Sequence, residues 1–335
     1  MKKYVNLFVF VFMIGACLSQ GRAQTKSAVS YKNPVVDIAM PDPTVIKAAD
    51  GYFYVYATES TRNVPIMKSK DLVEWPYCNT AFTNKTRPRF EPKAGIWAPD
   101  INYINGKYVL YYAMSVWGGE QTCGIGVATA NSPQGPFTDH GKMFRSNEIG
   151  VQNSIDPSFL QYEGRNYLVW GSFRGIYVIE LTADGLSIMP GAKKKGIAGT
   201  AFEAVYIHKH GDYYYMFASI GSCCQGVKST YKVVVGRSKK VWGPYKDKTG
   251  KPMLKNGYSL VIGANDHFVG NGHGSQIIQD DAGQDWLLYH GFSRSTPENG
   301  RILLLDQIKW DQEGWPYVEG GSPSYETQKA PVFNN

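Results

Sequence analysis

One pattern occurs five times along this 335-residue chain and limits how it can fold. In each copy a short apolar run turns at a glycine and returns as an aromatic run, and four copies open with an acid. The copies span residues 42–58, 100–115, 156–173, 203–219 and 274–292. A glycine beside a polar residue between two apolar runs is typical of a β-hairpin turn. Each copy is therefore predicted to form a hairpin.

A second hairpin is predicted after each first one, near residues 66–76, 124–137, 175–188, 231–245 and 302–318. Two hairpins make a four-stranded antiparallel unit, and such units repeated around an axis form a β-propeller. A pair of β-sandwiches is the alternative, but it would not produce five spaced copies. We expect an all-β chain whose residues 30–325 form one five-bladed β-propeller with four-stranded antiparallel blades.

The composition agrees with a folded β-rich protein. Hydrophobic residues make up 43% of the chain and charged residues 19%, and there are 23 tyrosines. This balance excludes disorder, and aromatic side chains suit both strands and the gaps between blades. The net charge of +7 includes Lys2, Lys3 and Arg22 near the N-terminus. The rest of the chain therefore gives no ground for a nucleic-acid partner.

The N-terminus has the features of a bacterial export signal. Lys2-Lys3 precedes an apolar stretch over residues 5–18, which is too short for a membrane span. Two interpretations are open. Cleavage after Ala23 would remove residues 1–23 as a signal peptide, whereas Ile14-Gly15-Ala16-Cys17 resembles a lipobox and would leave a lipid on Cys17. We expect a periplasmic, secreted or lipid-anchored protein, with that lipid as its one link to a membrane.

Four further cysteines are Cys78, Cys123, Cys223 and Cys224, and none has the spacing of paired zinc ligands. Export would allow disulfide formation. Because Cys223 and Cys224 are adjacent, a bond between them would close a strained ring. We therefore slightly favour two unbonded side chains packed in a loop.

Acids open four of the five repeats, at Asp42, Asp100, Asp156 and Glu203. The innermost strands of a propeller run in the same direction along its axis, so these acids are predicted to gather at one mouth of the channel. Crowded carboxylates have divergent pKa values, as glycoside hydrolysis requires. Asp100 is the weakest candidate, because it could equally cap a turn, bind a metal or contact a sugar.

Four short motifs in order resemble glycoside hydrolase family 43. They are Met40-Pro41-Asp42-Pro43, Trp97-Ala98-Pro99-Asp100, Ser154-Ile155-Asp156-Pro157 and Ala201-Phe202-Glu203-Ala204. The resemblance implies a five-bladed propeller that hydrolyses pentose glycans with inversion of configuration. It also implies that Asp42 is the general base, that Glu203 is the general acid, and that Asp156 tunes the pKa and orientation of the acid.

The segment Gly221-Ser222-Cys223-Cys224-Gln225-Gly226 resembles the endo-α-1,5-L-arabinanase branch of this family. That resemblance implies cleavage of α-1,5-L-arabinofuranosidic bonds in arabinan, a side chain of plant pectin. It also implies a metal near the axis, often calcium, at the position of His273. Calcium prefers six to eight oxygen ligands, so water would have to supply most of them.

Sugar contacts are predicted at Trp97, Asp100, Asn153 and Ser172, which offer an aromatic face or hydrogen-bonding groups beside the acids. Several alternatives remain open at this stage. An exo-α-L-arabinofuranosidase or a β-xylosidase of the same family would share these motifs. A retaining fructan-processing propeller would call for Arg before Asp156-Pro157, where this chain has Ile155. A non-catalytic glycan-binding propeller would be favoured by the loss of Asp42, Asp156 or Glu203, but all three acids are present.

Overall fold

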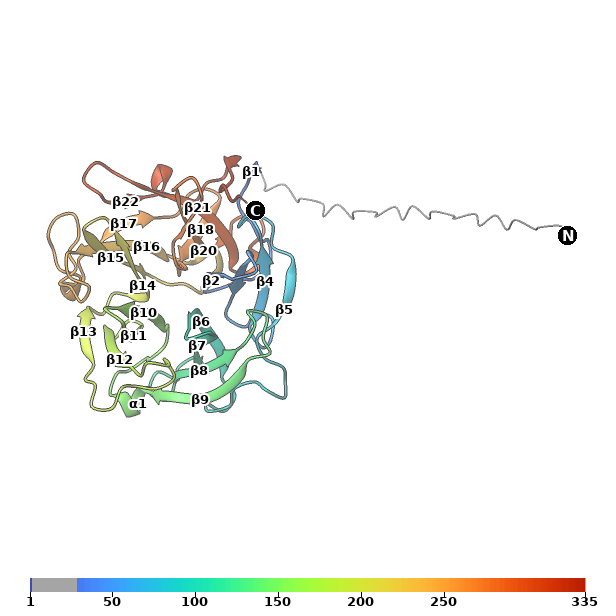
Figure 1. Cartoon of the computed structure of the whole chain (residues 1–335). Helices are drawn as coiled ribbons and strands as arrows, with labels where there is room; N and C mark the ends of the chain where they lie inside the picture. Colours follow the sequence, from blue (N-terminus) through green and yellow to red (C-terminus); the bar gives the residue numbers. More distant parts are fainter. Residues whose placement is uncertain (2–28, 335) are drawn as a thin grey trace.

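The computed structural model describes residue 1 and residues 29–334 of the chain. Five antiparallel sheets surround a common centre, so the predicted all-β, five-bladed propeller is confirmed (Figure 1). Both interpretations of the export signal, and Cys17 with them, fall on residues outside the described part. Among the described residues, no helix is long and apolar enough to cross a membrane.

Each blade uses one continuous stretch of chain. Blade I contains β2 (Thr44–Lys47), β3 (Phe53–Tyr56), β4 (Pro65–Ser69) and β5 (Tyr77–Thr80). Blade II contains β6 (Gly95–Ile104), β7 (Lys107–Ser115), β8 (Gly124–Ala130) and β9 (Thr138–Arg145). Blade III contains β10 (Ser158–Tyr162), β11 (Arg165–Trp170), β12 (Ile176–Leu181) and β13 (Lys195–Ala198). Blade IV contains β14 (Glu203–His210), β15 (Tyr213–Ile220), β16 (Lys232–Ser238) and β17 (Ser259–Ile262).

Blade V contains β18 (Phe268–Gly272), β19 (Ile278–Gln279), β20 (Asp285–Ser293), β21 (Ile302–Trp310) and β22 (Pro316–Tyr317). The helical elements are short: α1 (Ser146–Ile149) and the 3-10 turns η1 (Gly226–Lys228), η2 (Met253–Lys255), η3 (Pro297–Asn299) and η4 (Glu319–Gly321). All of them lie in connections between strands.

Five predicted strand positions are wrong in detail. The outer strands of blades I to IV, β5, β9, β13 and β17, begin after the predicted hairpins end at residues 76, 137, 188 and 245. In blades III and IV, the isolated bridges Leu181–Ile188 and Arg237–Lys246 precede the outer strand, because loops are inserted there. In blade V the innermost strand is β18, which ends before the predicted start at Gly274.

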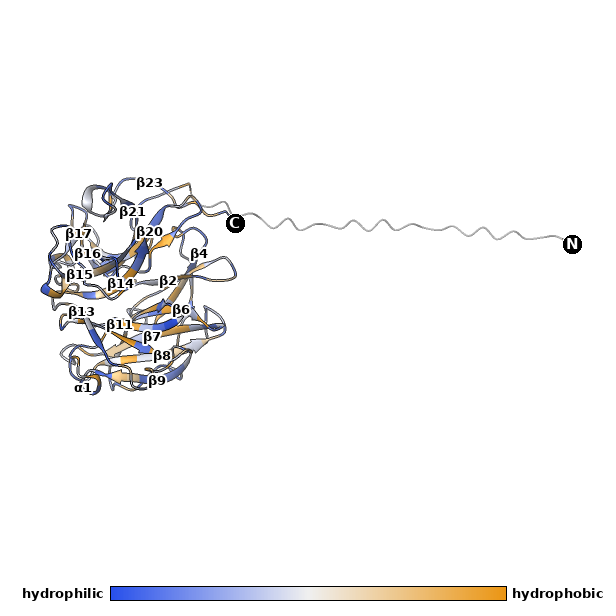
Figure 2. Cartoon of the chain, turned by 60° about the vertical axis from the view of Figure 1, so that its left-hand side comes forward, coloured by the Kyte–Doolittle hydropathy of each residue, from blue (hydrophilic) through white to orange (hydrophobic). Residues whose placement is uncertain are grey.

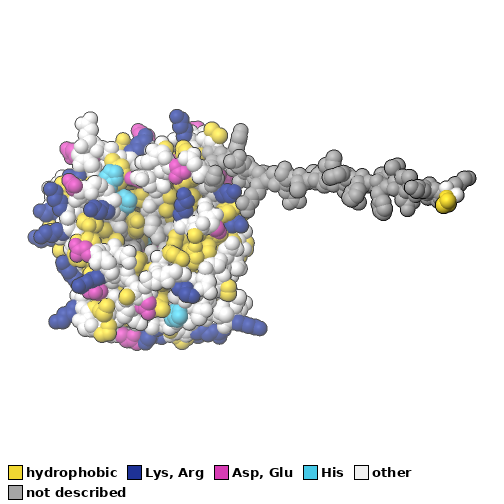
Figure 3. Space-filling model, viewed as in Figure 1, with side chains coloured by type: hydrophobic (Ala, Val, Ile, Leu, Met, Phe, Trp, Pro, Cys, Tyr) yellow, Lys and Arg dark blue, Asp and Glu magenta, His cyan; other side chains and the backbone are white. Residues whose placement is uncertain are grey.

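The spaces between blades are filled largely by aromatic and β-branched side chains. Between blades I and II, Tyr54 and Tyr56 pack in one buried cluster with Leu110, Tyr112 and Phe137. Hydrophobic and hydrophilic stretches alternate along the strands, as Figure 2 shows by colour. Lys and Arg side chains lie around the rim of the face shown in Figure 3, with Asp and Glu between them. The tyrosine-rich composition therefore reflects packing between blades.

The two ends of the described chain meet on blade V. β1 (Ser30–Tyr31) pairs with β23 (Gln328–Lys329), which extends the fold slightly beyond the predicted limit at residue 325. The backbone N–H groups of Val35 and Val36 both donate to the carbonyl oxygen of Leu303 on β21. The N-terminal segment thus lies along the last blade and connects it to the first.

Candidate active site

One residue in the innermost strand region of every blade has a left-handed backbone. These residues are Asp42 (φ 53°), Ala98 (φ 41°), Asp156 (φ 57°), Ala204 (φ 53°) and His273 (φ 51°). They are equivalent positions around the axis, and the pairing to the second strand shifts at this point in blades II and IV. Non-glycine residues rarely adopt this conformation, and where they do it often marks a functional site.

This equivalence corrects the predicted alignment of the four acids. Asp42 and Asp156 occupy the left-handed position itself, whereas Glu203 comes one residue before it and Asp100 two residues after it. Side chains alternate along a strand, so these offsets place the acids at different depths. Asp42, Asp156 and Glu203 line one cleft of about 410 Å³ at the mouth of the channel. Asp100 lines a separate cavity of about 30 Å³ farther along the axis.

Asp42 is held by a dense set of donors. Its Oδ1 accepts a hydrogen bond from Arg301 at 2.7 Å, and its Oδ2 accepts one from the Thr58 hydroxyl at 2.6 Å. His273 Nδ1 lies 3.2 Å from Oδ1. Burial alone would raise the pKa of Asp42, but Arg301, and after it His273 and His290, outweigh burial and hold the pKa well below its usual value. Asp42 is therefore a carboxylate at every pH at which the protein would work.

Neighbouring blades fix the backbone around the left-handed residues. The N–H of Asp42 donates to His290 Nδ1 at 3.0 Å, and the N–H of Ala204 donates to Asp156 Oδ2 at 3.1 Å. The N–H of His273 donates to the Ser219 hydroxyl at 2.9 Å. Each contact joins one blade to the next around the ring. The position of each acid is therefore set by the closed ring rather than by its own strand.

Glu203 and Asp156 form an electrostatically coupled pair. Burial raises the pKa of both groups, and each is further raised by nearby carboxylates: Glu203 and Asp42 act on Asp156, and Asp42 acts on Glu203. The Ser172 hydroxyl donates to Glu203 Oε2 at 2.6 Å and opposes this rise, as does a hydrogen bond from Tyr231. Two such carboxyl groups titrate as a unit and hold a proton between them at neutral pH. The cleft therefore combines one fixed carboxylate with one proton-bearing pair.

Asn153 and Ser172 both line the cleft, and their side chains form a hydrogen-bonded series that ends at Glu203. Asn153 Nδ2 donates to the Ser172 hydroxyl at 2.9 Å, and Ser172 in turn donates to Glu203. The Ser172 hydroxyl therefore orients Glu203, and the sugar contacts predicted for Asn153 and Ser172 stay predictions. Asn153 in turn orients the Ser172 hydroxyl through its own hydrogen bond.

Asp100 is not among the residues that line the cleft, so its predicted sugar contact has no support from its position. Its Oδ2 accepts hydrogen bonds from the N–H of Phe159 at 2.7 Å and from Asn102 Nδ2 at 2.7 Å. Burial raises its pKa to about 7, although these hydrogen bonds oppose the rise. Asp100 therefore ties blades II and III together below the cleft.

The cleft walls carry aromatic side chains and a disulfide. Trp97 and Trp117 stand next to each other, with ring centroids 5.5 Å apart, and the Trp117 side chain is exposed. Cys223 and Cys224 also line the cleft, and they are bonded to each other, so our preference for unbonded side chains was wrong. The aromatic pair gives a sugar ring a flat face on one side of the cleft.

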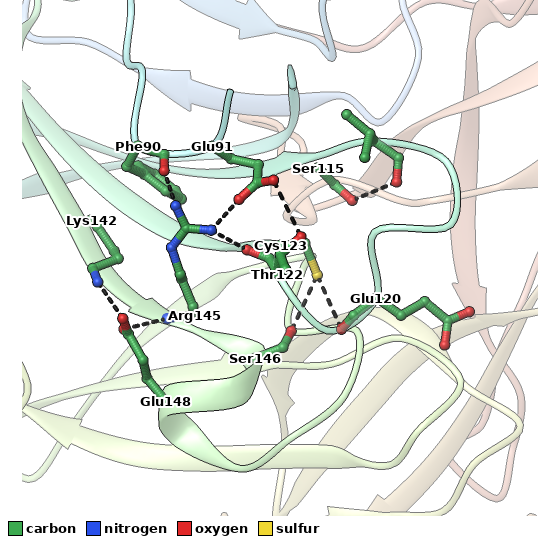
Figure 4. Close-up of polar contacts among 11 residues, drawn as sticks. Phe90, Glu91, Ser115, Glu120, Thr122, Cys123, Lys142, Arg145, Ser146 and Glu148 are labelled. Carbon is green, nitrogen blue, oxygen red and sulfur yellow. Dashed lines mark hydrogen bonds and ion pairs between the residues drawn. The ribbon is translucent and has the colours of Figure 1, made fainter. Parts of the chain in front are cut away.

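A polar network fastens the rim loop that carries Glu120 and Trp117 (Figure 4). Arg145, at the end of β9, binds Glu91 and the carbonyl oxygens of Phe90 and Thr122. The Cys123 thiol lies 3.2 Å from the Ser146 hydroxyl, at the start of α1. Cys123 and Ser146 are buried and Arg145 is half-buried, so contacts to blade II position the loop.

Sequence reasoning did not identify Arg301, Thr58 or His290, which together hold Asp42. Thr58 ends the first repeat, and Ser115 and Ser219 end two others. This recurrence of a hydroxyl residue was a weak signal for a shared role at the end of the repeat. Arg301 and His290 lie on or beside blade V strands and approach Asp42 only because the ring closes. No pattern within a single repeat could have revealed them.

A propeller cleft that combines a fixed carboxylate, a proton-sharing carboxyl pair and an aromatic wall defines a glycoside hydrolase. The chain belongs to glycosyl hydrolases family 43, whose family model matches residues 31–316. The predicted family is therefore confirmed.

The chain is similar to several arabinan-degrading enzymes. An extracellular endo-α-(1→5)-L-arabinanase of Bacillus subtilis is 36% identical over 290 residues, covering 82% of this chain and 86% of the relative. An extracellular exo-α-(1→5)-L-arabinofuranosidase, ArbA, of Cellvibrio japonicus is 35% identical over 308 residues, covering 83% and 86%. Among solved structures, a Cellvibrio cellulosa α-L-arabinanase in complex with arabinohexaose has a TM-score of 0.77 at 34% identity, covering 86% of this chain and 98% of that one.

Proposed function

We propose that this protein is an arabinan endo-1,5-α-L-arabinanase that hydrolyses its substrate with inversion. The observation that carries the proposal is the split between the acids: Arg301 keeps Asp42 ionised, while burial and mutual repulsion keep a proton on the pair of Glu203 and Asp156. An inverting glycosidase needs one group of each kind. The names of the relatives support an arabinofuranose polymer as the substrate.

In the proposed mechanism, Glu203 donates its proton to the glycosidic oxygen as the bond from that oxygen to the anomeric carbon breaks. Asp42 takes a proton from a water molecule as the water oxygen bonds to the anomeric carbon from the opposite side. Both protons are accounted for, and the configuration inverts in a single displacement. Asp156 accepts the Ala204 N–H beside the acid, and its role is to tune Glu203, because the two carboxyl groups repel each other when both are ionised.

The acid and base roles can be separated by the leaving group. Replacement of either group by its amide should lower kcat by about 10²–10⁴-fold on linear arabinan. On an aryl α-L-arabinofuranoside with an acidic phenol, Glu203→Gln should recover most of its activity, because that phenol leaves without protonation. Asp42→Asn should remain impaired on both substrates. Equal loss in both variants on both substrates would contradict the assignment.

Inversion and endo action need separate measurements. NMR of the first product formed should show the β-anomer of the arabinose reducing end. The time course on debranched arabinan should show intermediate oligosaccharides before arabinose. Release of short products of one size from the outset would favour the exo action named for the Cellvibrio japonicus relative. Activity on xylan alone, or none with glycan binding retained, would overturn the proposal.

A calcium ion bound through His273 is a further proposal. His273 lines both the cleft and the 30 Å³ cavity below it, which has room for about one ion or water. Four carboxyl groups around it favour a cation, although within residues 29–334 no group of three metal-ligating side chains includes His273. A calcium ion there would need water for most of its ligands and would add positive charge beside the acids. Chelation followed by calcium titration, with thermal unfolding and activity as readouts, tests the proposal.

We also propose export, supported by the basic and apolar N-terminal segment and by relatives described as extracellular. Intact-mass measurement of the protein from a bacterial host separates the two routes. A chain starting at Gln24 indicates a cleaved signal peptide, and a diacylglycerol-modified Cys17 indicates a lipoprotein. A chain retaining Met1 would contradict both.

A further inference from the structure

Two histidines and a buried aspartate come together far from the cleft, between blades IV and V. His208 and His210 lie on β14, and Asp285 is the first residue of β20. Residues two apart on a strand point to the same face, so both imidazoles face blade V. A ligand atom from each of the three side chains lies within 4.8 Å of the others. The strand β14 begins at Glu203 in the cleft, and at the usual rise per residue His210 lies about 23 Å farther along that strand.

The carboxyl group of Asp285 is held in place by neutral donors. Trp310 Nε1 donates to Oδ2 at 2.8 Å, and Gln279 Nε2 donates to Oδ1 at 3.2 Å. Asp285 is only 4% exposed. Within the described chain, the basic side chains close to it are the two imidazoles, with His210 Nδ1 3.7 Å from Oδ2 and a His208 nitrogen within the 4.8 Å of the cluster. A buried carboxylate normally has a cation as its partner, so this group lacks full charge compensation.

The imidazoles are also oriented before any ion binds. The ring of His210 stacks on Trp310 with centroids 3.7 Å apart and planes 8° apart, which leaves its nitrogen-bearing edge free. His208 lies nearly parallel to the same indole at 6.1 Å. Trp310 therefore orients His210 by stacking and Asp285 by hydrogen bonding, which is the role of an outer partner in a metal site. His210 is 38% exposed at its side chain, so an ion can enter from solvent.

We propose that His208, His210 and Asp285 form a binding site for a divalent transition-metal ion, best matched by Zn²⁺. Two imidazoles and one carboxylate are a common set of three zinc ligands, and water completes the tetrahedron. Tetrahedral geometry places ligand atoms about 3.4 Å apart, so side-chain rotations of about 1 Å would close the site. The ion joins the inner strand of blade IV to the second strand of blade V. It stabilises the ring and takes no part in hydrolysis.

The test begins with the full-length protein stripped by a chelator and titrated with Co²⁺, a spectroscopic probe for zinc sites. We expect one ion per chain with the strong visible absorption of four-coordinate cobalt, displaced by Zn²⁺. Zn²⁺ should also raise the unfolding temperature, because it binds the folded state. Absence of both effects would overturn the proposal.

Variants locate the ion and separate it from other sites. His210→Ala and Asp285→Asn should abolish the cobalt spectrum and the zinc-dependent rise in unfolding temperature. Gln279→Leu, which removes one donor to Asp285, should weaken binding by about 10–100-fold. His140→Ala is the matched control, since within residues 29–334 this exposed histidine bonds only to Thr129 on blade II. His273→Ala should keep the cobalt spectrum. Binding unchanged in the first two variants, or lost in His273→Ala, would place the ion elsewhere and overturn the proposal.

If Asp285→Asn fails to fold, His208→Gln provides the second variant. Within residues 29–334 the His208 imidazole makes no hydrogen bond, so its replacement leaves the Trp310 and Gln279 contacts to Asp285 intact. Far-ultraviolet circular dichroism and metal-free unfolding temperature report the fold of every variant. Full cobalt binding by a folded His208→Gln protein would also count against the three-ligand site.

Discussion

Asp42 shows how a single residue obtains its chemistry from several blades. Its own strand supplies only the left-handed backbone, whereas Thr58, His273, His290 and Arg301 supply the contacts. Burial would otherwise push a carboxyl group toward its neutral form. The cation of Arg301 is the largest effect in the opposite direction. Arg301 is thus the residue on which the ionisation of the base mainly depends.

Arg301→Met should move the acidic limb of the pH profile of kcat/KM to higher pH. Without the guanidinium, burial raises the pKa of Asp42, so the base becomes protonated at a pH where the wild type is active. Most activity should return as the pH rises through the new pKa. Arg294→Met, at an exposed arginine that bonds the Asn265 carbonyl, is the control and should keep the wild-type profile. A loss that is the same at every pH would indicate that Arg301 binds substrate instead.

Asp100→Asn should flatten the pH dependence of stability. The pKa of Asp100 is about 7 in the folded state and about 3.9 in an unfolded chain, so between these values the folded state holds an extra proton. Wild-type stability therefore falls as the pH rises from about 4 to about 7. Asparagine can still accept from Phe159 and Asn102 but does not titrate. Urea unfolding at several pH values should show the variant gaining on the wild type as the pH rises, whereas Asp212→Asn, in an exposed turn, should stay parallel to it.

At the level of strands and hairpins, the sequence predicted most of the fold, because turn glycines and alternating apolar runs are local signals. It identified the inner hairpins and the three cleft acids. It misplaced Asp100, since the acids were aligned with one another, whereas the backbone aligns Asp42 with Ala98. The strand register that decides depth depends on contacts between blades, and no single repeat contains that information.

Ser219→Ala should be more destabilising than Ser115→Ala, although both serines are buried near the cleft end of the second strand of a blade. The Ser219 hydroxyl accepts the N–H of His273, so its loss leaves a buried donor unsatisfied at a cost of about 1–3 kcal/mol. The Ser115 hydroxyl donates to the adjacent Val116 carbonyl at 3.2 Å and contacts the Cys123 thiol, so its removal leaves no buried backbone N–H without its partner. Denaturant unfolding of the two variants compares the costs directly, and equal values would contradict this account of the inner strands.

At the scale of the whole molecule, the ring has no strand exchanged between its first and last sheets within residues 29–334. Closure depends instead on the N-terminal segment, which lies along β21. Asn33 is its most connected residue: its amide accepts the N–H of Leu305 at 2.9 Å and donates to the Leu305 carbonyl at 2.9 Å. The Asn33 amide thus makes the same two hydrogen bonds to Leu305 that a residue of a neighbouring strand would make. Leu305 belongs to blade V, which also supplies Arg301 and His290 to hold Asp42.

Asn33→Ala should therefore destabilise the whole ring, by about 1–3 kcal/mol for the buried groups of Leu305 that it leaves unpaired. Asn33→Asp should be worse near neutral pH, because it keeps the acceptor for the Leu305 N–H but loses the donor and places a second carboxyl group beside Asp306, which lies 3.2 Å from the Asn33 amide nitrogen. Asn79→Ala is the control, since this exposed amide donates only to the Gln134 carbonyl. Hydrogen exchange should show the added opening in β21 and in β2, on both sides of the closure. Opening confined to residues 29–36, with unfolding free energies equal to that of Asn79→Ala, would mean that the ring is closed by packing between blades alone.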